Sequence, residues 1–284
     1  MLWTPQNEFG YTVDNFGATI TDAGFATSVN AHATNANQKG TAVSLIAGAS
    51  VLQDIFGVAI VFTGGNTAAS IRRFLADLLV DPAGGTAWST LIPNLFVNNP
   101  SLLCGGYRYY FPIYIKAGSS IGCQQQCSTA NIPFRCGVRL FGKPSRPELV
   151  KVGSKVEAFG VTAASTSGTA LTPGNAVVGA YASMGTSVAD LWWWQWGGIG
   201  TNDTTMTPQK GGFGDVAAGD ATNKKICVEG CNQMVTAAEE STKEAFGLMV
   251  PIRHIKGGET VYVRASMSGA ADTTPTTTAY GLGG

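Results

Sequence analysis

The sequence has few charged residues, few histidines and no long apolar run. Charged residues make up 13% of the 284 positions, against roughly a quarter in a usual globular protein. The 18 Lys and Arg balance the 18 Asp and Glu, so no basic field attracts nucleic acid or an anionic membrane surface. The longest apolar run, 55–62, is far shorter than the ~20 residues of a membrane-spanning helix. We therefore expect no direct nucleic-acid or membrane partner.

The sequence also lacks a convincing catalytic centre. Its two histidines are His32, in a polar low-complexity stretch, and His254, in an apolar strand-like run; neither is placed as a general base. Residues 118–122 fit G-x-S-x-G by letter, but no helical period follows, so a turn between strands is the better interpretation. No phosphate-binding or dinucleotide-binding glycine motif occurs. We expect no enzymatic activity and no cofactor.

Two weaker chemical alternatives concern cysteines and carboxylates. Cys123 and Cys127, like Cys227 and Cys231, have a spacing within the broad range of zinc ligands. Because the two pairs fall in different halves of the chain, no metal site is predicted. A glycosidase needs two facing carboxylates, and nothing in the sequence selects such a pair. The carboxylates are therefore interpreted as solvated surface charges.

Turn-forming residues are abundant, with 37 Gly and 12 Pro, yet hydrophobic residues reach 44% and provide for a packed core. Short apolar runs between glycines predict strands at 55–62, 107–115, 191–196 and 246–255. Two other stretches, 71–80 and 234–246, are compatible with either helix or strand. Several short strands in each 130 residues or so favour an all-β sandwich or jelly roll.

An internal repeat runs through the sequence. Residues 13–19 match 156–162, residues 40–43 match 174–177, residues 54–56 match 190–192, and residues 112–121 match 251–261. The matches keep their order while the offset drifts between 134 and 143, as insertions in loops would produce. We therefore expect Phe16 to superpose on Phe159, Asp54 on Asp190 and Ile115 on Ile255.

These matches predict two tandem copies of one β-sandwich or jelly-roll-like domain. Copy one spans 10–142 and copy two spans 153–284; the linker between them, 143–152, carries Pro144 and Pro147. Residues 1–9 begin a polar N-terminal arm that is suited to lie across an adjacent subunit.

The segment 192–196, with four tryptophans in five residues, is the most unusual in the chain. Strand alternation places Trp192, Trp194 and Trp196 on one face, where they continue a core row, and Leu191 and Trp193 on the other. Because the counterpart of Trp193 in copy one is a glycine, no core role is implied for it. We predict an interface role for Trp193. The alternatives are a sugar-stacking platform and coverage by the domain's own loops or N-terminal segment.

The six cysteines are expected to be thiols while the chain folds. The first residues show neither a basic nor an apolar signal region, so synthesis in a reducing cytoplasm is expected. Burial as free thiols is one interpretation. The other is that Cys123, Cys127, Cys227 and Cys231 oxidise after release and cross-link domains or neighbouring subunits.

Residues 78–88, which include Asp81-Pro82-Ala83-Gly84-Gly85, together with 91–93 and 109–121, resemble virion structural proteins of tailed bacteriophages. The resemblance covers copy one well, whereas copy two clearly keeps only the strand and turn at 251–261. It implies a β-rich particle component without enzymatic activity. The protein would be made in the host bacterial cytoplasm and end in the virion.

Within a particle, we expect a capsid decoration or minor capsid protein that stabilises the shell, as a symmetric homo-oligomer. Its partners would be other copies of itself and the major capsid or other virion proteins, since a charge-poor surface suits interface cores. The alternatives are a collar, tail or baseplate component, a double jelly-roll major capsid protein, and a glycan-binding or receptor-binding module.

Overall fold

The structure is a computed structural model that describes residues 10–16, 26–64, 73–98, 107–144, 151–160, 163–164, 168–175, 177–200, 210–237, 240–242, 254–267 and 276–284. These residues form strands and one 3-10 turn at 48–50, which confirms the all-β prediction. The described parts of the two ambiguous stretches are strands, β5 (Arg73–Asp81), β16 (Lys224–Ala237) and β17 (Glu240–Thr242). Within the described ranges no helix is long and apolar enough to cross a membrane.

The chain divides into two compact units. The first comprises Met1–Ala68, Ala76–Pro93 and Pro100–Lys155, and the second comprises Ala69–Leu75, Asn94–Asn99 and Val156–Gly284. The N-terminal arm predicted at 1–9 and the central part of the predicted linker, 145–150, lie outside the described residues.

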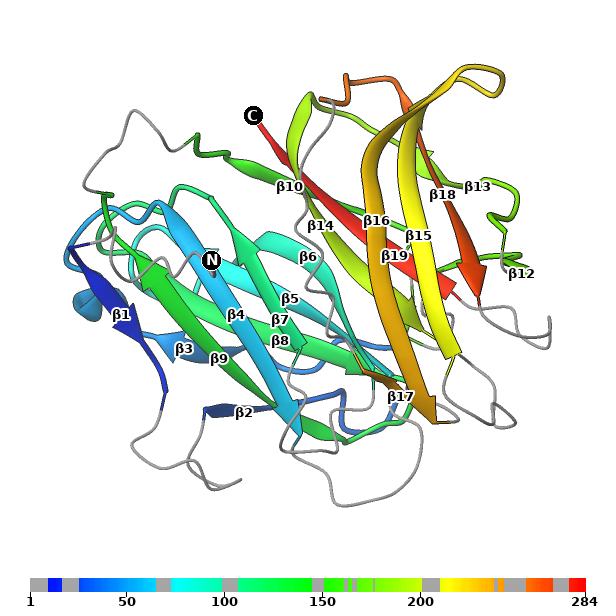
Figure 1. The fold of residues 1–284 in the computed structure, drawn as a ribbon. Coiled ribbons are helices and arrows are strands. Elements are labelled where there is room, and N and C mark those ends of the chain that lie inside the picture. The colour runs from blue at the N-terminus through cyan, green and yellow to red at the C-terminus, as the bar shows by residue number, and fades with distance from the viewer. Residues whose placement is uncertain are drawn as a thin grey trace. The chain divides into compact units, whose positions relative to one another are not determined.

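Two sheets lie largely in the first unit; residues 73–75 and 94–98 of their strands fall in the second. One has the order β1 (Thr12–Asp14), β9 (Pro133–Phe141), β4 (Gly57–Gly64), β7 (Tyr107–Phe111), with β2 (Thr27–Asn30) also on β9 (Figure 1). The other has the order β3 (Val43–Ile46), β8 (Ser120–Cys127), β5, β6 (Ser89–Asn98). On β4, alternate residues Val58, Ile60 and Phe62 are at most 1% exposed and form the core row that period-2 alternation predicts.

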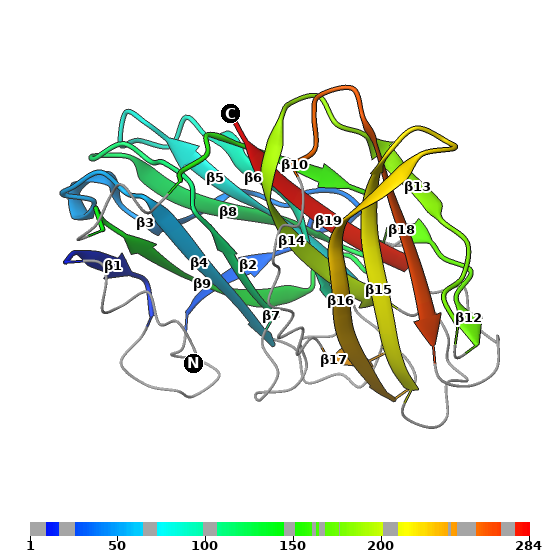
Figure 2. The ribbon, with the colours of Figure 1, turned by 45° about the horizontal axis from the view of Figure 1, so that its top comes forward.

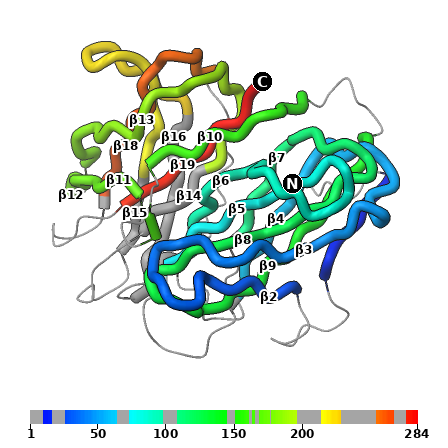
Figure 3. Tube along the Cα trace, turned by 180° about the vertical axis from the view of Figure 1, so that it is seen from behind, coloured from blue at the N-terminus to red at the C-terminus, as the bar shows by residue number. Residues whose placement is uncertain are grey.

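Strand pairing in the first unit is that of a jelly roll. In chain order, β1, β3, β4, β5, β6, β7, β8 and β9 are eight strands in which the first pairs with the eighth, the second with the seventh, the third with the sixth and the fourth with the fifth. This is the pairing of one long hairpin rolled into two sheets. Figure 3 shows β3 beside β8, the second and seventh strands.

The second unit repeats this order. One sheet runs β10 (Lys155–Phe159), β19 (Thr276–Gly283), β11 (Thr169–Ala170), with β14 (Leu191–Gly200) also on β19. The other runs β12 (Gly174–Asn175), β18 (Thr260–Met267), β15 (Lys210–Gly219), β16, β17, with β13 (Ala182–Thr186) also on β18. Figure 2 shows β13, β18, β15 and β16 edge to edge. The row β13-β18-β15-β16 corresponds to β3-β8-β5-β6 of the first unit.

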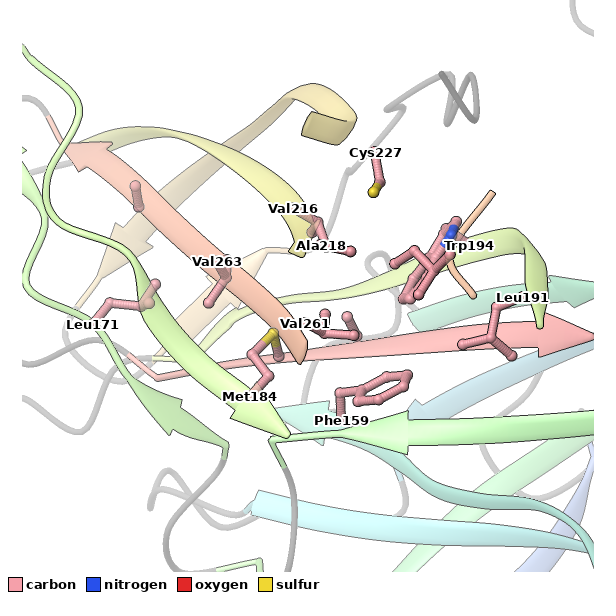
Figure 4. Close-up of a cluster of buried hydrophobic side chains, with 13 residues drawn as sticks. Phe159, Leu171, Met184, Leu191, Trp194, Val216, Ala218, Cys227, Val261 and Val263 are labelled. Carbon is pink, nitrogen blue, oxygen red and sulfur yellow. The ribbon is translucent and has the colours of Figure 1, made fainter. Parts of the chain in front are cut away.

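The core of the second unit draws side chains from both of its sheets. Phe159 of β10 and Trp194 of β14 pack against each other with ring centroids 5.7 Å apart, and Val261 and Val263 of β18 are fully buried nearby (Figure 4). Burial of each such large side chain contributes about 1.5–3 kcal/mol. The two sheets are therefore held face to face as a sandwich.

The strand register of the first unit recurs in the second. β3 pairs with β8 through a bulge after Ser44, and β13 pairs with β18 through a bulge after Ser183, the equivalent residue. Ile55 bridges Ile115 in the first unit as Leu191 bridges Ile255 in the second. The equivalence of Ile115 and Ile255 is thus confirmed, while no register fixes Phe16 against Phe159, which remains a prediction.

One of the sequence matches was wrong. The Gly40 amide donates to the Gln125 carbonyl over 2.8 Å, and the bond at the corresponding place in the second unit runs from Gly179 to Ala265, also over 2.8 Å. Gly40 therefore corresponds to Gly179 and not to Gly174. The error arose because a short Gly-x-Ala-Val likeness lies in a segment whose loop length differs between the copies.

The alternation predicted for 191–196 is wrong at Leu191. Leu191 lies opposite Gly283 and Trp193 lies opposite Leu282, so Trp192 is the extra residue of a bulge. The bulge resets the alternation, and Leu191 is fully buried on the core side. Trp192 and Trp194 are buried as predicted, and the side chain of Trp196 lies outside the described residues.

Candidate functional site

The predicted site residues are dispersed through the fold. Trp193, on β14, is half-buried, and its predicted interface role stays a prediction. Cys123, Cys127 and Cys227 are buried and at most 1% exposed, and the side chain of Cys231 lies outside the described residues. A cross-link from any of the first three to a neighbouring subunit would require its strand to open.

The residues considered for catalysis have structural partners instead. Ser120 begins strand β8, is 2% exposed and accepts the Gly48 amide over 3.0 Å, so it does not sit on a strand-to-helix elbow. His32 uses its Nδ1 to accept the amides of Thr34 and Asn35 in a turn. In the part of the chain that the structure describes, no group of three metal-ligating side chains comes together.

A pair of loop tips, residues 51–54 and 187–190, is built in the same way in the two units. In the first, the Gly118 amide donates to the Val51 carbonyl over 2.8 Å, and Asp54 Oδ1 accepts the Ala117 amide over 2.9 Å. In the second, the equivalent bonds run from Gly258 to Ser187 over 2.8 Å and from Gly257 to Asp190 over 2.9 Å.

Glycine is required in the turn that holds each tip. Gly118 and Gly258 have φ values of +82° and +92°, in the left-handed region that other residues rarely adopt. With this glycine and the aspartate bond at equivalent positions, both loop tips are fixed by their own hydrogen bonds.

Each loop tip carries a strongly exposed aliphatic side chain at the same position. Leu52 is 74% exposed and Val188, its counterpart, is 78% exposed. A single exposed leucine is ordinary on a protein surface. An aliphatic side chain is thus strongly exposed at the equivalent position of both hydrogen-bonded loop tips.

Different side chains hold the backbone of the two tips. In the first unit, the Tyr11 hydroxyl accepts the Leu52 amide and donates to the Ser50 carbonyl, both over 2.8 Å. In the second, the Glu157 carboxylate accepts the amides of Val188 and Ala189, both over 2.9 Å. The projecting conformation is thus held by Tyr11 in the first unit and by Glu157 in the second.

Phe56 and Tyr114, the sequence neighbours of the bridged residues Ile55 and Ile115, form an aromatic pair. Tyr114 is 45% exposed and packs edge-on against Phe56 with ring centroids 5.9 Å apart. Partial burial, followed by the nearby Asp54 carboxylate, raises the pKa of the Tyr114 phenol.

A second surface feature lies on the outer face of the β13-β18-β15-β16 sheet, and we call it the aromatic–cation cluster: Tyr181, Tyr262, Lys224 and Arg264. On β18, Val261 and Val263 face the core, so Tyr262 and Arg264 face outward. The Arg264 guanidinium lies 4.6 Å from the centroid of the Tyr181 ring, and the Lys224 ammonium lies 4.8 Å from that of Tyr262. The two rings meet edge to face, with centroids 6.3 Å apart.

A buried carboxylate anchors this cluster. Asp215 is 3% exposed, and its Oδ2 accepts Nε and Nη2 of Arg264, both at 2.9 Å. In the first unit a buried carboxylate, Asp77, accepts Gln124, the equivalent of Arg264, over 2.9 Å, and Lys39 over 2.7 Å. Desolvation lowers the pKa of Lys39, and the Asp77 carboxylate opposes that shift.

Neither of these surface features was predicted from the sequence. Leu52 and Val188 stand two residues before the matched Asp54 and Asp190, so extending that match upstream would have paired them. Tyr262 and Arg264 alternate with valines in a strand-like run. Neither signal reveals the exposure of the side chains or the partner strands beside them.

No protein-family model matches the chain, and no curated protein matches it. Among solved structures, PNGF-II in its P21 crystal form shares 8% identity at a TM-score of 0.42, over 98% of this chain and 66% of that one, so the chain spans just under two thirds of its length. Tripeptidyl peptidase 2 shares 9% at a TM-score of 0.29, over 97% and 23%. The CBM22-1–CBM22-2 tandem domain of Paenibacillus barcinonensis Xyn10C shares 9% at 0.27, over 88% and 84%. Likeness at this level carries no inference about function.

Proposed function

We propose that the chain is a non-enzymatic structural protein of a tailed-bacteriophage particle, a capsid decoration or minor capsid protein that stabilises the shell through contacts with neighbouring subunits. The observation that carries the proposal is the repeated loop tip, with Leu52 and Val188 exposed at equivalent positions of two rigid turns. Jelly rolls serve in viral capsids and also elsewhere, so the fold alone does not decide the function.

The loop tips contact an apolar surface on a neighbouring virion protein. Leu52 and Val188 offer aliphatic carbon, which gains from transfer out of water by about 25 cal/mol per Å² buried. Because the turns are held by hydrogen bonds within each unit, little conformational entropy is lost on docking. Two such contacts on one chain reinforce each other when both engage the same particle.

The test is a pair of charge substitutions at the tips. Leu52→Asp and Val188→Asp in one chain place carboxylates where apolar burial is expected. Shells prepared without the protein should co-sediment the wild type, and the double variant should bind at least about tenfold more weakly. Both substituted side chains are exposed, so the variant should keep its fold by circular dichroism.

Ala33→Asp is the matched control, because Ala33 is also an exposed apolar residue in a loop. It should co-sediment like the wild type. Equal binding by the double variant and the wild type would overturn the proposal, and so would an equal loss in the Ala33 variant.

A double jelly-roll major capsid protein is a second candidate, and the strand order favours it. The sheet orders β3-β8-β5-β6 and β13-β18-β15-β16 are those expected of two jelly rolls in one chain. The candidates differ in what purified protein does alone. A major capsid protein assembles into closed shells, whereas a decoration protein binds shells that already exist.

A further inference from the structure

We propose that the aromatic–cation cluster of the second unit binds an acidic sugar, a pyranose ring that carries a carboxylate. The proposal is independent of the particle role, because it rests on different residues. Tyr181 and Tyr262 would contact the ring, and Lys224 would neutralise the carboxylate.

The charges of the cluster favour an anionic ligand. Arg264 is neutralised by Asp215, whose carboxylate is too deeply buried for a ligand to reach. Lys224 bonds the Ala221 carbonyl, and in the described part of the chain no ion pair joins it to a carboxylate. The carboxylate of the nearby Asp220 accepts the amides of Thr222 and Asn223, and in the described structure it forms no ion pair with Lys224. One ammonium group is therefore left to attract an anionic group.

The two tyrosines of the cluster favour a ligand with an apolar face of C–H bonds. Tyr181 and Tyr262 are both partly exposed and lie side by side on the outer face of the sheet. Aromatic rings of this kind offer an apolar face and a polar hydroxyl together, which fits a ring with C–H bonds on its faces and hydroxyls at its edge. An inorganic anion would use Lys224 but would gain nothing from the tyrosines.

The cluster is rigid before any ligand arrives. Two hydrogen bonds from Arg264 to Asp215 fix the guanidinium, which in turn lies over Tyr181. The second Asp215 oxygen, Oδ1, is buried and has no hydrogen-bond partner in the described structure, so the carboxylate is held by its arginine alone. Preorganisation of this kind lowers the entropic cost of binding.

The first unit serves as an internal comparison, because the same fold lacks the cluster there. Gly122 stands in place of Tyr262, and a side chain at that position would meet the Trp88 ring at about 3.0 Å. Ala42 replaces Tyr181 and Gln124 replaces Arg264. The jelly roll therefore does not require the aromatic and cationic residues of the second unit, which points to a ligand.

The experiment titrates the full chain with three probes and follows side-chain resonances of labelled tyrosines by NMR. The probes are methyl glucuronide, methyl glucoside as the neutral sugar, and acetate as the anion without a ring. We expect saturable shifts with the glucuronide at millimolar concentration and at least about tenfold weaker binding of the other two, a difference of roughly 1.4 kcal/mol. Equal binding of acetate and glucuronide would reduce the site to a simple anion site and overturn the proposal.

Two variants locate the site, with one control. Lys224→Met and Tyr262→Ala should each weaken glucuronide binding at least about tenfold, while Lys225→Met, the same charge change at the adjacent exposed residue, should leave it unchanged. A thermal melt checks that each variant is folded. No saturable shift in the wild type would refute the site, and so would equal losses in the Lys224 and Lys225 variants. Shell co-sedimentation should be unaffected in all three, which separates this proposal from the particle role.

Discussion

Asp54 and Asp190 make the same hydrogen bond at the same place in the two units, to the amides of Ala117 and Gly257. Both carboxylates are on exposed residues, so water partly replaces a lost bond. We expect Asp54→Ala and Asp190→Ala each to lower the free energy of unfolding by about 1 kcal/mol in urea titrations. The Asn variants keep an acceptor oxygen and should lose less. Asn variants as unstable as the Ala variants would show that the bond is not the cause.

Two turn carboxylates predict a specific acid sensitivity. Amide hydrogen bonds, from Ala83 and Ala87 to Asp81 and from Asn223 and Thr222 to Asp220, lower both pKa values below the ordinary 3.8. A depressed folded-state pKa adds stability above the unfolded pKa, and this contribution is lost as the pH falls towards the folded value. In urea titrations, the Asp81→Asn, Asp220→Asn double variant should be less stable than the wild type near pH 5, and the difference should shrink towards about pH 3. A difference that does not change with pH would contradict the account.

At the scale of elements, the chain entering the second strand of each sandwich passes close to another backbone segment. A Cβ atom on Gly40 would collide with the Asn30 carbonyl, and one on Gly179 with the Thr172 carbonyl. Because backbone cannot give way as a flexible side chain does, Gly40→Ala and Gly179→Ala should each lower stability by about 1–3 kcal/mol. Gly10→Ala, with nothing within 4 Å of the new atom, should change the denaturation midpoint little. An equal effect at Gly10 would remove the steric explanation.

Elements also show where sequence reasoning ends. The predicted burial of Trp192 and Trp194 is confirmed. Alternation misplaced Leu191, because the bulge at Trp192 depends on pairing with Gly283 and Leu282 more than eighty residues away along the chain. The stretch at 71–80 has helical spacing, yet residues 73–81 are a strand whose side chains are almost all buried. Because both faces of the strand are buried, the sequence shows no period-2 alternation of apolar and polar residues.

At the scale of the whole molecule, the all-β class followed from the sequence. Two copies of one domain are predicted because turns and core positions recur in order. The jelly-roll pairing of first strand with last did not follow from the sequence, since nothing local links Thr12 to Phe141. The candidate surfaces were missed for the same reason. Leu52 and Val188 resemble core residues in composition, and only the folded turns expose them.

The particle role is tested most directly by cryo-electron microscopy of the intact virion at a resolution that traces side chains. The account predicts this chain in symmetric copies on the capsid shell, with Leu52 and Val188 buried against neighbouring subunits. It would be contradicted if the chain were absent from the particle, or if it were found in the shell with both loop tips facing solvent.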